Sequence, residues 1–317
     1  MFTELKVNDF RALKNQTFKL GKYATMLSGG NATGKSTVLA LLANSTELKP
    51  KDGKTYNGGL FRSEFCEILK GSQNHDKTAQ NRLEIIWTDG ISEIKKTFRT
   101  AWQDEDTRFR VIPREKLPNG KFNEAKFELP VIYLGLSRLY PLGEAEDDAL
   151  KDKEQPFITN EDREWFKDNH CEILSTWDSV TGIQNIDLKG TKKNTSAINA
   201  KNYDWKSNSS GQDNLSQILL AVLSFKKLKR DPEFKYKGGL LLIDEIESSL
   251  HPIAQEKLVD FLVKEARSTN FQVIFTTHSL TIIENISKKN MLRKWRPYPL
   301  LFPKSKSEIS YRERQTF

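Results

Sequence analysis

The chain has 317 residues, 37% hydrophobic and 29% charged, with a formal net charge of +8; these proportions suit a globular protein and exclude a disordered or collagen-like chain. Cys66 and Cys171 lie far apart without a CxxC partner, which argues against a zinc site and against a disulfide framework. No apolar run is long enough to span a membrane and the N-terminus does not resemble a signal peptide, so we expect a cytoplasmic protein.

The first predicted elements are short strands and one helix. Residues 5–10 alternate between apolar and polar side chains, and residues 18–20 repeat the pattern after a short polar link. Residues 23–27 form an apolar strand that leads directly into glycines, and the pattern TVLALLA at 37–43 begins a helix.

Two alternating stretches, 82–87 and 91–98, flank Asp89-Gly90. This arrangement predicts a β-hairpin, because glycine readily adopts the positive φ of a tight turn. A further buried strand is predicted at 131–136.

The composition becomes polar after residue 143, first acidic and later rich in Lys, Asn and Ser. Within this region apolar side chains recur at helical spacing, namely Trp165, Phe166, Ile173, Leu174 and Trp177. The sequence therefore predicts a helical insert, or lid, at 145–205.

The last third alternates between helices and apolar strands. Residues 213–229 have an amphipathic helical pattern, and a second helix is predicted from Pro252 to about Arg267. Apolar strands are predicted at 239–243 and 271–276. Such alternation predicts a parallel sheet covered by helices on both faces.

The positive charge is concentrated at the C-terminal end. Residues 286–317 contain nine Lys or Arg against Glu308 and Glu313, so the rest of the chain is close to neutral. A basic tail of this kind is more commonly a solvated surface than a contact for a polyanion such as DNA.

A glycine-rich segment follows the 23–27 strand and matches the pattern GxxxxGK[ST]. Backbone N–H groups that curl around a phosphate require glycines, and the next helix directs its positive end at the anion. Lysine at this position reaches the β- and γ-phosphates, and the following hydroxyl coordinates Mg²⁺. The segment consists of Gly29, Gly30, Asn31, Ala32, Thr33, Gly34, Lys35 and Ser36, and Thr37 follows it.

Two carboxylates follow the apolar strand at 239–243. They are expected at the carboxyl edge of a parallel sheet, where ligands of such sheets bind. Asp244 would hold Mg²⁺, and Glu245 would polarise the water that attacks the γ-phosphate.

Two further segments are weaker signals when taken alone. Ser209-Ser210-Gly211-Gln212 precedes the amphipathic helix, and by itself this is most simply a helix cap. Thr276-Thr277-His278-Ser279 follows the 271–276 strand, which places His278 at the same sheet edge as Asp244.

In this order, the phosphate loop, SSGQ, LLLIDE and TTHS resemble the nucleotide-binding head of ABC-type ATPases, in the branch that includes SMC, RecF and OLD-type proteins. Asp9-Phe10-Arg11 resembles the NFR segment of that branch, and residues 247–252 (ESSLHP) resemble its E-x-S-L-H-P segment. The resemblance covers roughly residues 1–140 and 205–285.

The resemblance implies an α/β P-loop NTPase of the ABC-head type. Its central sheet would be parallel or mixed, with an N-terminal antiparallel β subdomain and the helical insert. The implied units are an N-terminal lobe (1–144), the insert (145–205), a C-terminal lobe (206–285) and the basic tail (286–317).

The resemblance also implies that two heads enclose two ATP molecules with Mg²⁺, in a homodimer or higher homo-oligomer. Lys35, Glu245 and His278 would be catalytic, with His278 at the γ-phosphate. Arg11 would contact the nucleotide. The segment from Ser209 to Gln212 would contact ATP bound by the partner, and residues 249–251 would communicate across the dimer.

This sequence departs from the family pattern in two motifs. The SSGQ segment lacks the leading Leu and second Gly of LSGGQ. The glutamine that normally follows the phosphate loop has two candidate positions, Gln73 and the region 63–65. The insert also lacks the heptad pattern of an SMC coiled coil.

The chain ends too soon after His278 for the Toprim nuclease domain of OLD-type proteins, and no other nuclease pattern appears. We therefore expect a separate nuclease or effector, as in anti-phage defence ATPases of the Septu or retron type. The alternatives are a RecF-type repair ATPase that binds DNA and, with less support, the ATP-binding subunit of an ABC transporter.

Overall fold

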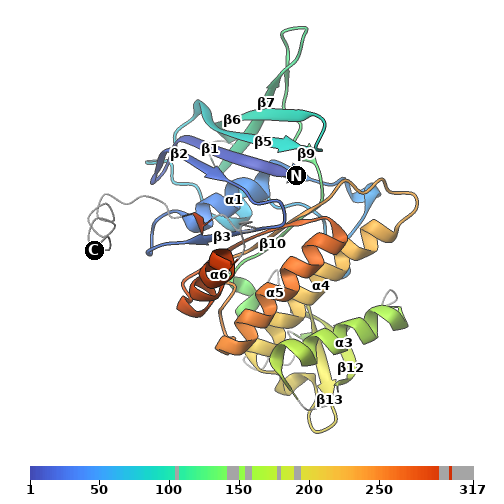
Figure 1. Cartoon of the computed structure of the whole chain (residues 1–317). Coiled ribbons are helices and arrows are strands. Elements are labelled where there is room, and N and C mark those ends of the chain that lie inside the picture. The colour runs from blue at the N-terminus through green and yellow to red at the C-terminus, as the bar shows by residue number, and fades with distance from the viewer. Residues whose placement is uncertain are drawn as a thin grey trace, which may run out of the picture.

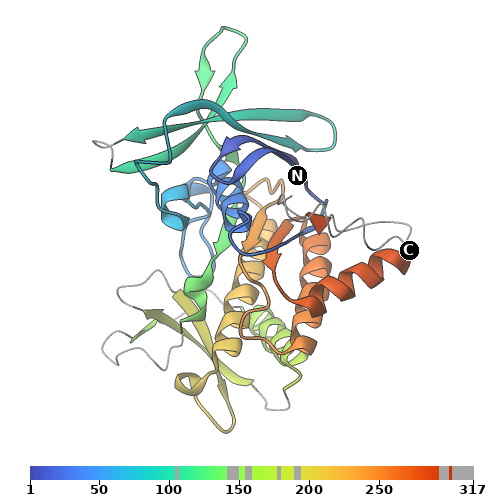
Figure 2. The ribbon, with the colours of Figure 1, turned by 90° about the vertical axis from the view of Figure 1, so that its left-hand side faces the viewer.

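The computed structural model describes residues 1–103, 107–140, 150–153, 159–176, 180–188, 194–292 and 300–301. An antiparallel sheet lies at one end of the molecule, a parallel sheet in the middle, and the insert at the other end (Figures 1 and 2). Trp177 and most of the predicted basic tail lie outside the described residues. No helix in the described part of the chain is long and apolar enough to cross a membrane.

The antiparallel sheet has six strands in the order β2–β1–β5–β6–β7–β8. Its members are β1 (Phe2–Phe10), β2 (Leu13–Lys19), β5 (Ala79–Thr88), β6 (Glu93–Gln103), β7 (Arg108–Lys116) and β8 (Phe122–Asn123). The predicted hairpin is confirmed, since Thr88 pairs with Glu93 across a turn in which Gly90 has a φ of 99°. The N-terminal antiparallel β subdomain is thus present as predicted.

The parallel sheet has five strands in the order β10–β14–β15–β3–β16. Its members are β3 (Ala24–Ser28), β10 (Val131–Leu134), β14 (Leu240–Ile243), β15 (Gln272–Thr277) and β16 (Leu300–Leu301). Every strand pair in it is parallel, so all its carboxyl ends meet at one edge. Short elements connect the two sheets: β4 (Thr46–Glu47), η1 (Pro50–Asp52), α2 (Phe65–Ile68) and β9 (Phe127–Glu128). The 3₁₀ turn η2 (Leu136–Leu139) follows β10 and leads toward the insert.

The core has two halves, one on each face of the parallel sheet. Successive side chains of a strand point to opposite faces, and β14 shows the consequence. Leu240 and Leu242 pack with α1 (Lys35–Ser45) and the antiparallel sheet, whereas Leu241 and Ile243 pack with the helices on the other face. Helix α1 is apolar on all sides because it lies between two sheets.

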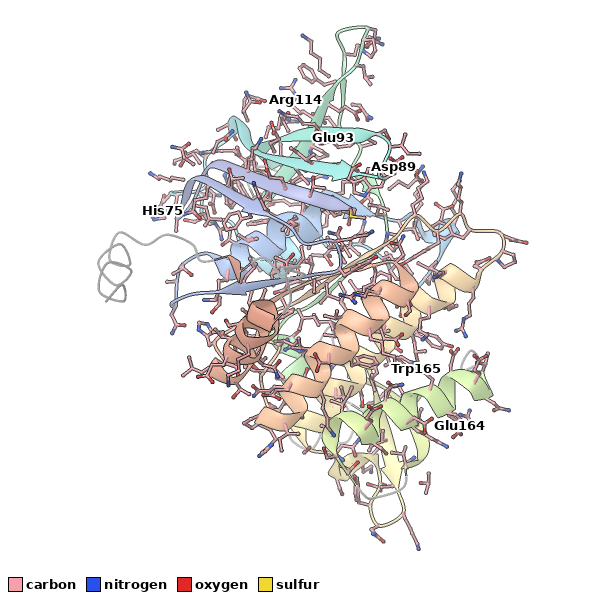
Figure 3. The ribbon with its side chains drawn as sticks, in the orientation of Figure 1. His75, Asp89, Glu93, Arg114, Glu164 and Trp165 are labelled. Atoms are coloured by element: carbon pink, nitrogen blue, oxygen red, sulfur yellow. The ribbon has the colours of Figure 1, made fainter. Side chains whose placement is uncertain are left out.

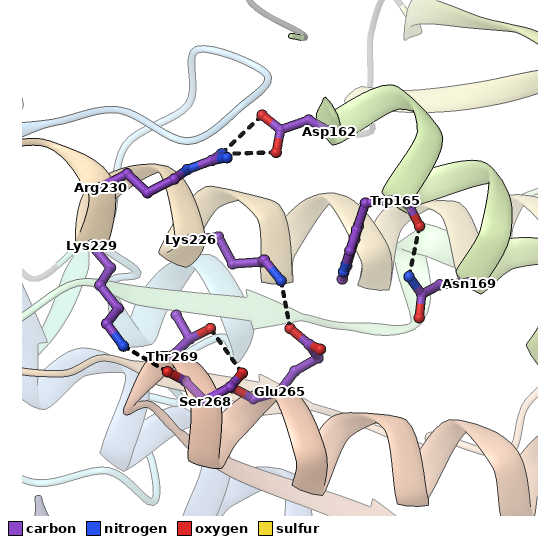
Figure 4. Close-up of polar contacts among 9 residues, drawn as sticks. All are labelled: Asp162, Trp165, Asn169, Lys226, Lys229, Arg230, Glu265, Ser268 and Thr269. Carbon is purple, nitrogen blue, oxygen red and sulfur yellow. Dashed lines mark hydrogen bonds and ion pairs between the residues drawn. The ribbon is translucent and has the colours of Figure 1, made fainter. Parts of the chain in front are cut away.

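Four helices lie on the other side of the parallel sheet: α3 (Asn160–Leu174), α4 (Ser210–Arg230), α5 (Pro252–Thr269) and α6 (Leu280–Leu292). Figure 4 shows polar contacts between three of them. Arg230 of α4 donates to both carboxylate oxygens of Asp162 on α3, at 2.8 and 2.9 Å. Lys226 of α4 pairs with Glu265 of α5 at 2.9 Å. The first contact holds α3 on the long helix that begins at the SSGQ segment, and the second holds α5 on the same helix.

The insert is not purely helical, contrary to the sequence prediction. It contains the predicted helix, α3, whose Glu164 and Trp165 lie at the end of the molecule opposite Asp89 and Glu93 (Figure 3). It also contains an antiparallel sheet of three strands, β11 (Leu150–Lys153), β12 (Val180–Leu188) and β13 (Asn194–Ala200). The apolar residues of β12 recur every third position, which masks the alternation that predicts a strand. A short 3₁₀ turn, η5 (Trp205–Ser207), leads from this sheet to α4.

Strand β7 is also absent from the sequence prediction. It contains Pro113, a residue that argues against a strand in the middle of a sheet. The outer neighbour β8 pairs only with Glu115 and Lys116, so Pro113 lies where that edge of β7 needs no backbone donor.

Candidate nucleotide site

The predicted phosphate loop connects β3 to α1 at the carboxyl edge of the parallel sheet. Gly29, Ala32 and Gly34 have φ values of 154°, 59° and 93°, so the backbone curls through conformations that suit glycine best. A β-carbon on Gly34 would come within 2.8 Å of the Leu13 side chain. Gly34 is also the N-cap of α1 and has no side chain to cap it, so the first N–H groups of this helix are open to an anion.

The remaining loop residues complete the cradle. The Thr33 hydroxyl donates to the Gly30 carbonyl at 2.9 Å. Asn31 is exposed, and Ser36 and Thr37 lie half-buried in the first turn of α1.

Lys35 is buried and its ammonium group folds back on the loop. It donates to the carbonyl oxygens of Gly29 and Gly30 at 3.0 and 2.7 Å. Burial lowers the pKa of Lys35, and the negative charges of Asp244, Glu245 and, more weakly, Glu247 oppose that shift. Lys35 therefore lies within electrostatic reach of all three carboxylates.

Asp244 follows β14, two strands from the phosphate loop. The strand between them, β15, supplies Thr276, whose hydroxyl donates to Asp244 Oδ1 at 2.6 Å. Tyr133, at the end of β10, lies on the other side, and burial followed by the charge of Asp244 raises its pKa. The carboxylate is thus held between Thr276 and Tyr133, from the two neighbouring strands.

Glu245 has an unusual backbone conformation, with a φ of 48°. Its N–H donates to the Thr276 hydroxyl at 2.7 Å, and its carbonyl accepts from Arg138 at 2.8 Å. One of its carboxylate oxygens accepts from the Ser248 hydroxyl at 3.2 Å. A left-handed conformation is disfavoured for any residue with a β-carbon, so these contacts maintain the placement of the carboxylate.

His278 lies directly after β15, as the sequence predicts. Its backbone N–H donates to Glu247 Oε1 at 2.6 Å. The other oxygen of Glu247 is buried and has no hydrogen-bond partner within the described residues. Glu247 is therefore a further acidic group beside the site, in addition to Asp244 and Glu245.

The SSGQ segment forms the start of α4. The Ser209 hydroxyl accepts from the Gln212 N–H at 3.3 Å, and the Gln212 side chain accepts from the Ser209 N–H at 2.8 Å. This capping box is the plain cap that the sequence alone favours. The segment also packs closely on the loop after β14, because a β-carbon on Gly211 would lie 2.4 Å from the Ser249 carbonyl oxygen. Ser210 is half-buried in the same turn.

The 249–251 segment is the last part of the connection from β14 to α5. Ser249 has a φ of 62°, Leu250 is buried, and His251 caps α5 by accepting from the Ile253 N–H at 3.4 Å. The segment that resembles E-x-S-L-H-P thus contacts the SSGQ segment of the same chain.

Arg11 makes its contacts away from the phosphate loop. It donates to both oxygens of Asp76 at 3.0 and 2.8 Å and to the Lys70 carbonyl at 2.7 Å. Its guanidinium also lies 5.2 Å from the centre of the Phe65 ring. To contact the nucleotide, Arg11 would have to do so while its guanidinium stays bound to Asp76.

No group of three or more His, Cys, Asp or Glu in the described part of the chain could hold a metal ion by itself. A single carboxylate and a hydroxyl, Asp244 and Ser36, nevertheless suit Mg²⁺, which keeps several waters and binds substrate phosphates. The residues present therefore fit a metal that is shared with a nucleotide.

Two residues of the site were missed by the sequence analysis. Thr276 was named only as part of the TTHS segment, and Arg138 was not singled out. Both lie at the carboxyl ends of parallel strands, and that position is the signal that could have identified them.

Comparison with known proteins extends this description. Residues 186–284 match the sequence model of a family described as "AAA domain, putative AbiEii toxin, Type IV TA system". An uncharacterized protein of Methanocaldococcus jannaschii is 44% identical over 48 residues, which cover 15% of this chain and 42% of that protein. The aligned part is thus less than half of that relative.

Several solved structures are similar over most of their length. The SMC head domain from Thermotoga maritima is 14% identical with a TM-score of 0.47, covering 90% of this chain and 91% of that one. An Smc head domain bound to the C-terminal domain of ScpA, derived from Pyrococcus furiosus, is 13% identical with a TM-score of 0.48 and covers the same shares. The recombination mediator RecF with ATP is 14% identical with a TM-score of 0.45, covering 88% and 92%.

Proposed function

We propose that this chain, which has a mixed α/β fold and matches the model of an AAA domain over residues 186–284, binds and hydrolyses ATP as a dimer that gates a partner protein. One observation carries the catalytic part. Strand β15 separates the strand of the phosphate loop from the strand of the two carboxylates, and its Thr276 hydrogen-bonds to Asp244. Lys35, the two carboxylates of Asp244 and Glu245, and the phosphate loop therefore lie at the same edge of the parallel sheet.

Each residue of this edge has a distinct task in the proposal. When ATP binds, the Lys35 ammonium would donate to phosphate oxygens in place of the two loop carbonyls. Charged phosphate oxygens are stronger acceptors for a buried ammonium than neutral carbonyls are. Glu245 acts as general base toward the attacking water, and His278 contacts the γ-phosphate. The backbone N–H groups of residues 29–37 hold the β-phosphate.

Asp244 and Ser36 would hold Mg²⁺ together with the phosphates. The metal would supply charge neutralisation on the phosphate oxygens. Thr276 donates to one oxygen of Asp244, and Tyr133 also hydrogen-bonds to this carboxylate, so both neighbours hold Asp244 at the sheet edge where the metal would bind.

The dimer part of the proposal rests on the surface beside this edge. Ser209 is exposed at the start of α4, where helix N–H groups can meet an anion. Ile253 and Leu280 are 57% and 73% exposed at the starts of α5 and α6, next to His251 and His278. We assign this surface to contact with a second copy of the chain.

For the biological role, we propose that hydrolysis times the activity of a separate nuclease or effector in anti-phage defence. The description of the matched family as a putative toxin of a toxin–antitoxin system supports an accessory role of this kind. RecF-type DNA repair is the second candidate, and the basic residues beyond Ile286 favour a test with DNA. A neighbouring gene for a nuclease or reverse transcriptase would support defence, and a permease gene would support transport.

The catalytic proposal is tested by ATPase and ATP-binding assays on two variants. Lys35→Ala should lose ATP binding, whereas Glu245→Gln should keep it and lose hydrolysis by about 10²- to 10⁴-fold, the usual effect of a general base. Lys49→Ala and Glu233→Gln are matched controls at exposed positions and should behave like the wild type. Undiminished hydrolysis by Glu245→Gln would remove Glu245 from its role.

The DNA question needs the same assay with duplex DNA present. Binding through phosphate contacts should weaken steeply with salt. Binding that ignores salt, or no binding, would exclude a RecF-like contact with DNA.

A further inference from the structure

Arg138 is a buried cation beside the proposed site. It lies in η2, directly after β10, and is 2% exposed. Among the described residues its guanidinium makes four hydrogen bonds, and none of these is to a carboxylate. The acceptors are Asn214 Oδ1 at 2.8 Å, Leu134 O at 3.2 Å, Gly135 O at 2.9 Å and Glu245 O at 2.8 Å.

Burying a charge without a direct ion pair is unfavourable. Burial lowers the pKa of Arg138 to about 10, and the charges of Asp244 and Glu245 only partly oppose this shift. An apolar residue would fill the same space without this cost, so a role other than packing is required to explain the residue.

The contacts of Arg138 connect two moving parts of the proposed cycle. On one side it bonds the carbonyl of Glu245, whose left-handed backbone needs such support. On the other side it bonds Asn214, in the second turn of α4, and Asn214 donates in turn to the Ser248 carbonyl at 2.7 Å. Gln217 of α4 also donates to the Arg138 carbonyl at 3.0 Å.

The start of α4 and the backbone around Glu245 are therefore not independent. A shift of α4 by a fraction of an ångström would move Asn214, and the short, directional bonds of a planar guanidinium would pass that movement to the Glu245 carbonyl. The Glu245 N–H is bound to Thr276 and its carbonyl to Arg138. A movement of Arg138 would therefore rotate the Glu245 backbone and change the position of its carboxylate.

We propose that Arg138 is a positioning residue that couples the SSGQ end of α4 to the general base Glu245. The inference rests on the proposed function, in which α4 meets ATP held by a second copy. Engagement of that ATP then sets Glu245 for hydrolysis, and a head that has not engaged keeps its ATP intact.

The test separates ATP binding from turnover. Arg138→Lys keeps the charge and most of the volume, but it cannot bond Asn214 and Glu245 at once. Its affinity for ATP should stay within about threefold of the wild type, while kcat should fall at least about tenfold, the pattern of an interaction needed only in the transition state. Arg163→Lys, at an exposed position on α3, is the matched control and should leave kcat unchanged.

Two further measurements distinguish positioning from a merely structural role. Asn214→Ala should lower kcat in the same way as Arg138→Lys. The double variant with both substitutions should have a kcat no lower than that of either single variant, because each substitution interrupts the same series of contacts. Millimolar guanidinium should partly restore kcat to Arg138→Ala but not to Asn214→Ala, with the melting temperature recorded for each.

The outcomes are distinct for the two proposals. A wild-type protein without ATPase activity would overturn the proposed function itself. An active wild type with an equally active Arg138→Lys variant would overturn the role of Arg138 alone. A parallel loss of ATP affinity and kcat, additive effects of the two substitutions, or no guanidinium rescue would also overturn that role.

Discussion

His170 provides a quantitative test of how the insert is packed on the rest of the molecule. It lies on α3, is fully buried and stacks on Phe166 at a centroid distance of 6.0 Å. Burial lowers its pKa from 6.5 to about 4, since the charged imidazolium is disfavoured there and the nearby Gln212 backbone opposes the shift only partly.

The direction of the pH effect follows from this shift. The unfolded chain binds a proton at His170 below its ordinary pKa of 6.5, whereas the folded protein does so only near 4. Stability is therefore fully present above about pH 6.5 and is lost as the pH falls toward about 4. The complete shift corresponds to about 3 kcal/mol, of which about 2 kcal/mol should be lost between about pH 7 and about pH 5.

The assay is urea unfolding at these two pH values, on the wild type and on His170→Leu. Leucine has a similar volume and no titrating group, so the variant should lose about 2 kcal/mol less than the wild type on acidification. His75→Leu is the control, because His75 is an exposed histidine at the other end of the molecule (Figure 3). Equal pH dependence of His170→Leu and the wild type would refute the reasoning.

Two other predictions concern the helix that begins at the SSGQ segment. Gly211→Ala should destabilise the protein by about 1–3 kcal/mol, because the added carbon would lie 2.4 Å from the Ser249 carbonyl oxygen. The control Gly182→Ala, whose added carbon would have its nearest neighbour at 3.5 Å, should not destabilise the protein. Equal melting temperatures of the two variants would contradict this prediction. Asp162→Asn should lower the free energy of unfolding by about 1 kcal/mol, because the Asp162 carboxylate is only 3% exposed and accepts from both Arg230, which is 45% exposed, and the Tyr56 hydroxyl. An unchanged urea midpoint would show that this ion pair contributes nothing.

The phosphate loop and the parallel strands could be predicted because local rules determine them. Gly29 and Gly34 stand where the backbone needs positive φ, and the strand that ends at Ile243 is apolar on both faces because both are covered. The same logic predicted that Asp244 and His278 would follow neighbouring strands. These features need no knowledge of distant contacts.

The features that were missed depend on contacts between distant segments. Arg138 acquires its partners only when β10, β14 and α4 come together. Arg11 is bound by Asp76, far along the chain, in a pairing that no spacing indicates. The strands of the insert, such as 180–188, show no clear alternation, so their pairing decides their structure.

The proposed function depends on a dimer that forms only when ATP is bound. Sedimentation velocity of Glu245→Gln measures it directly, because this variant should bind ATP without destroying it. We predict a dimer with ATP and Mg²⁺, a monomer without nucleotide, and a monomer under both conditions for Lys35→Ala. A Glu245→Gln protein that stays monomeric at saturating ATP, or that dimerises equally without nucleotide, would contradict the claim.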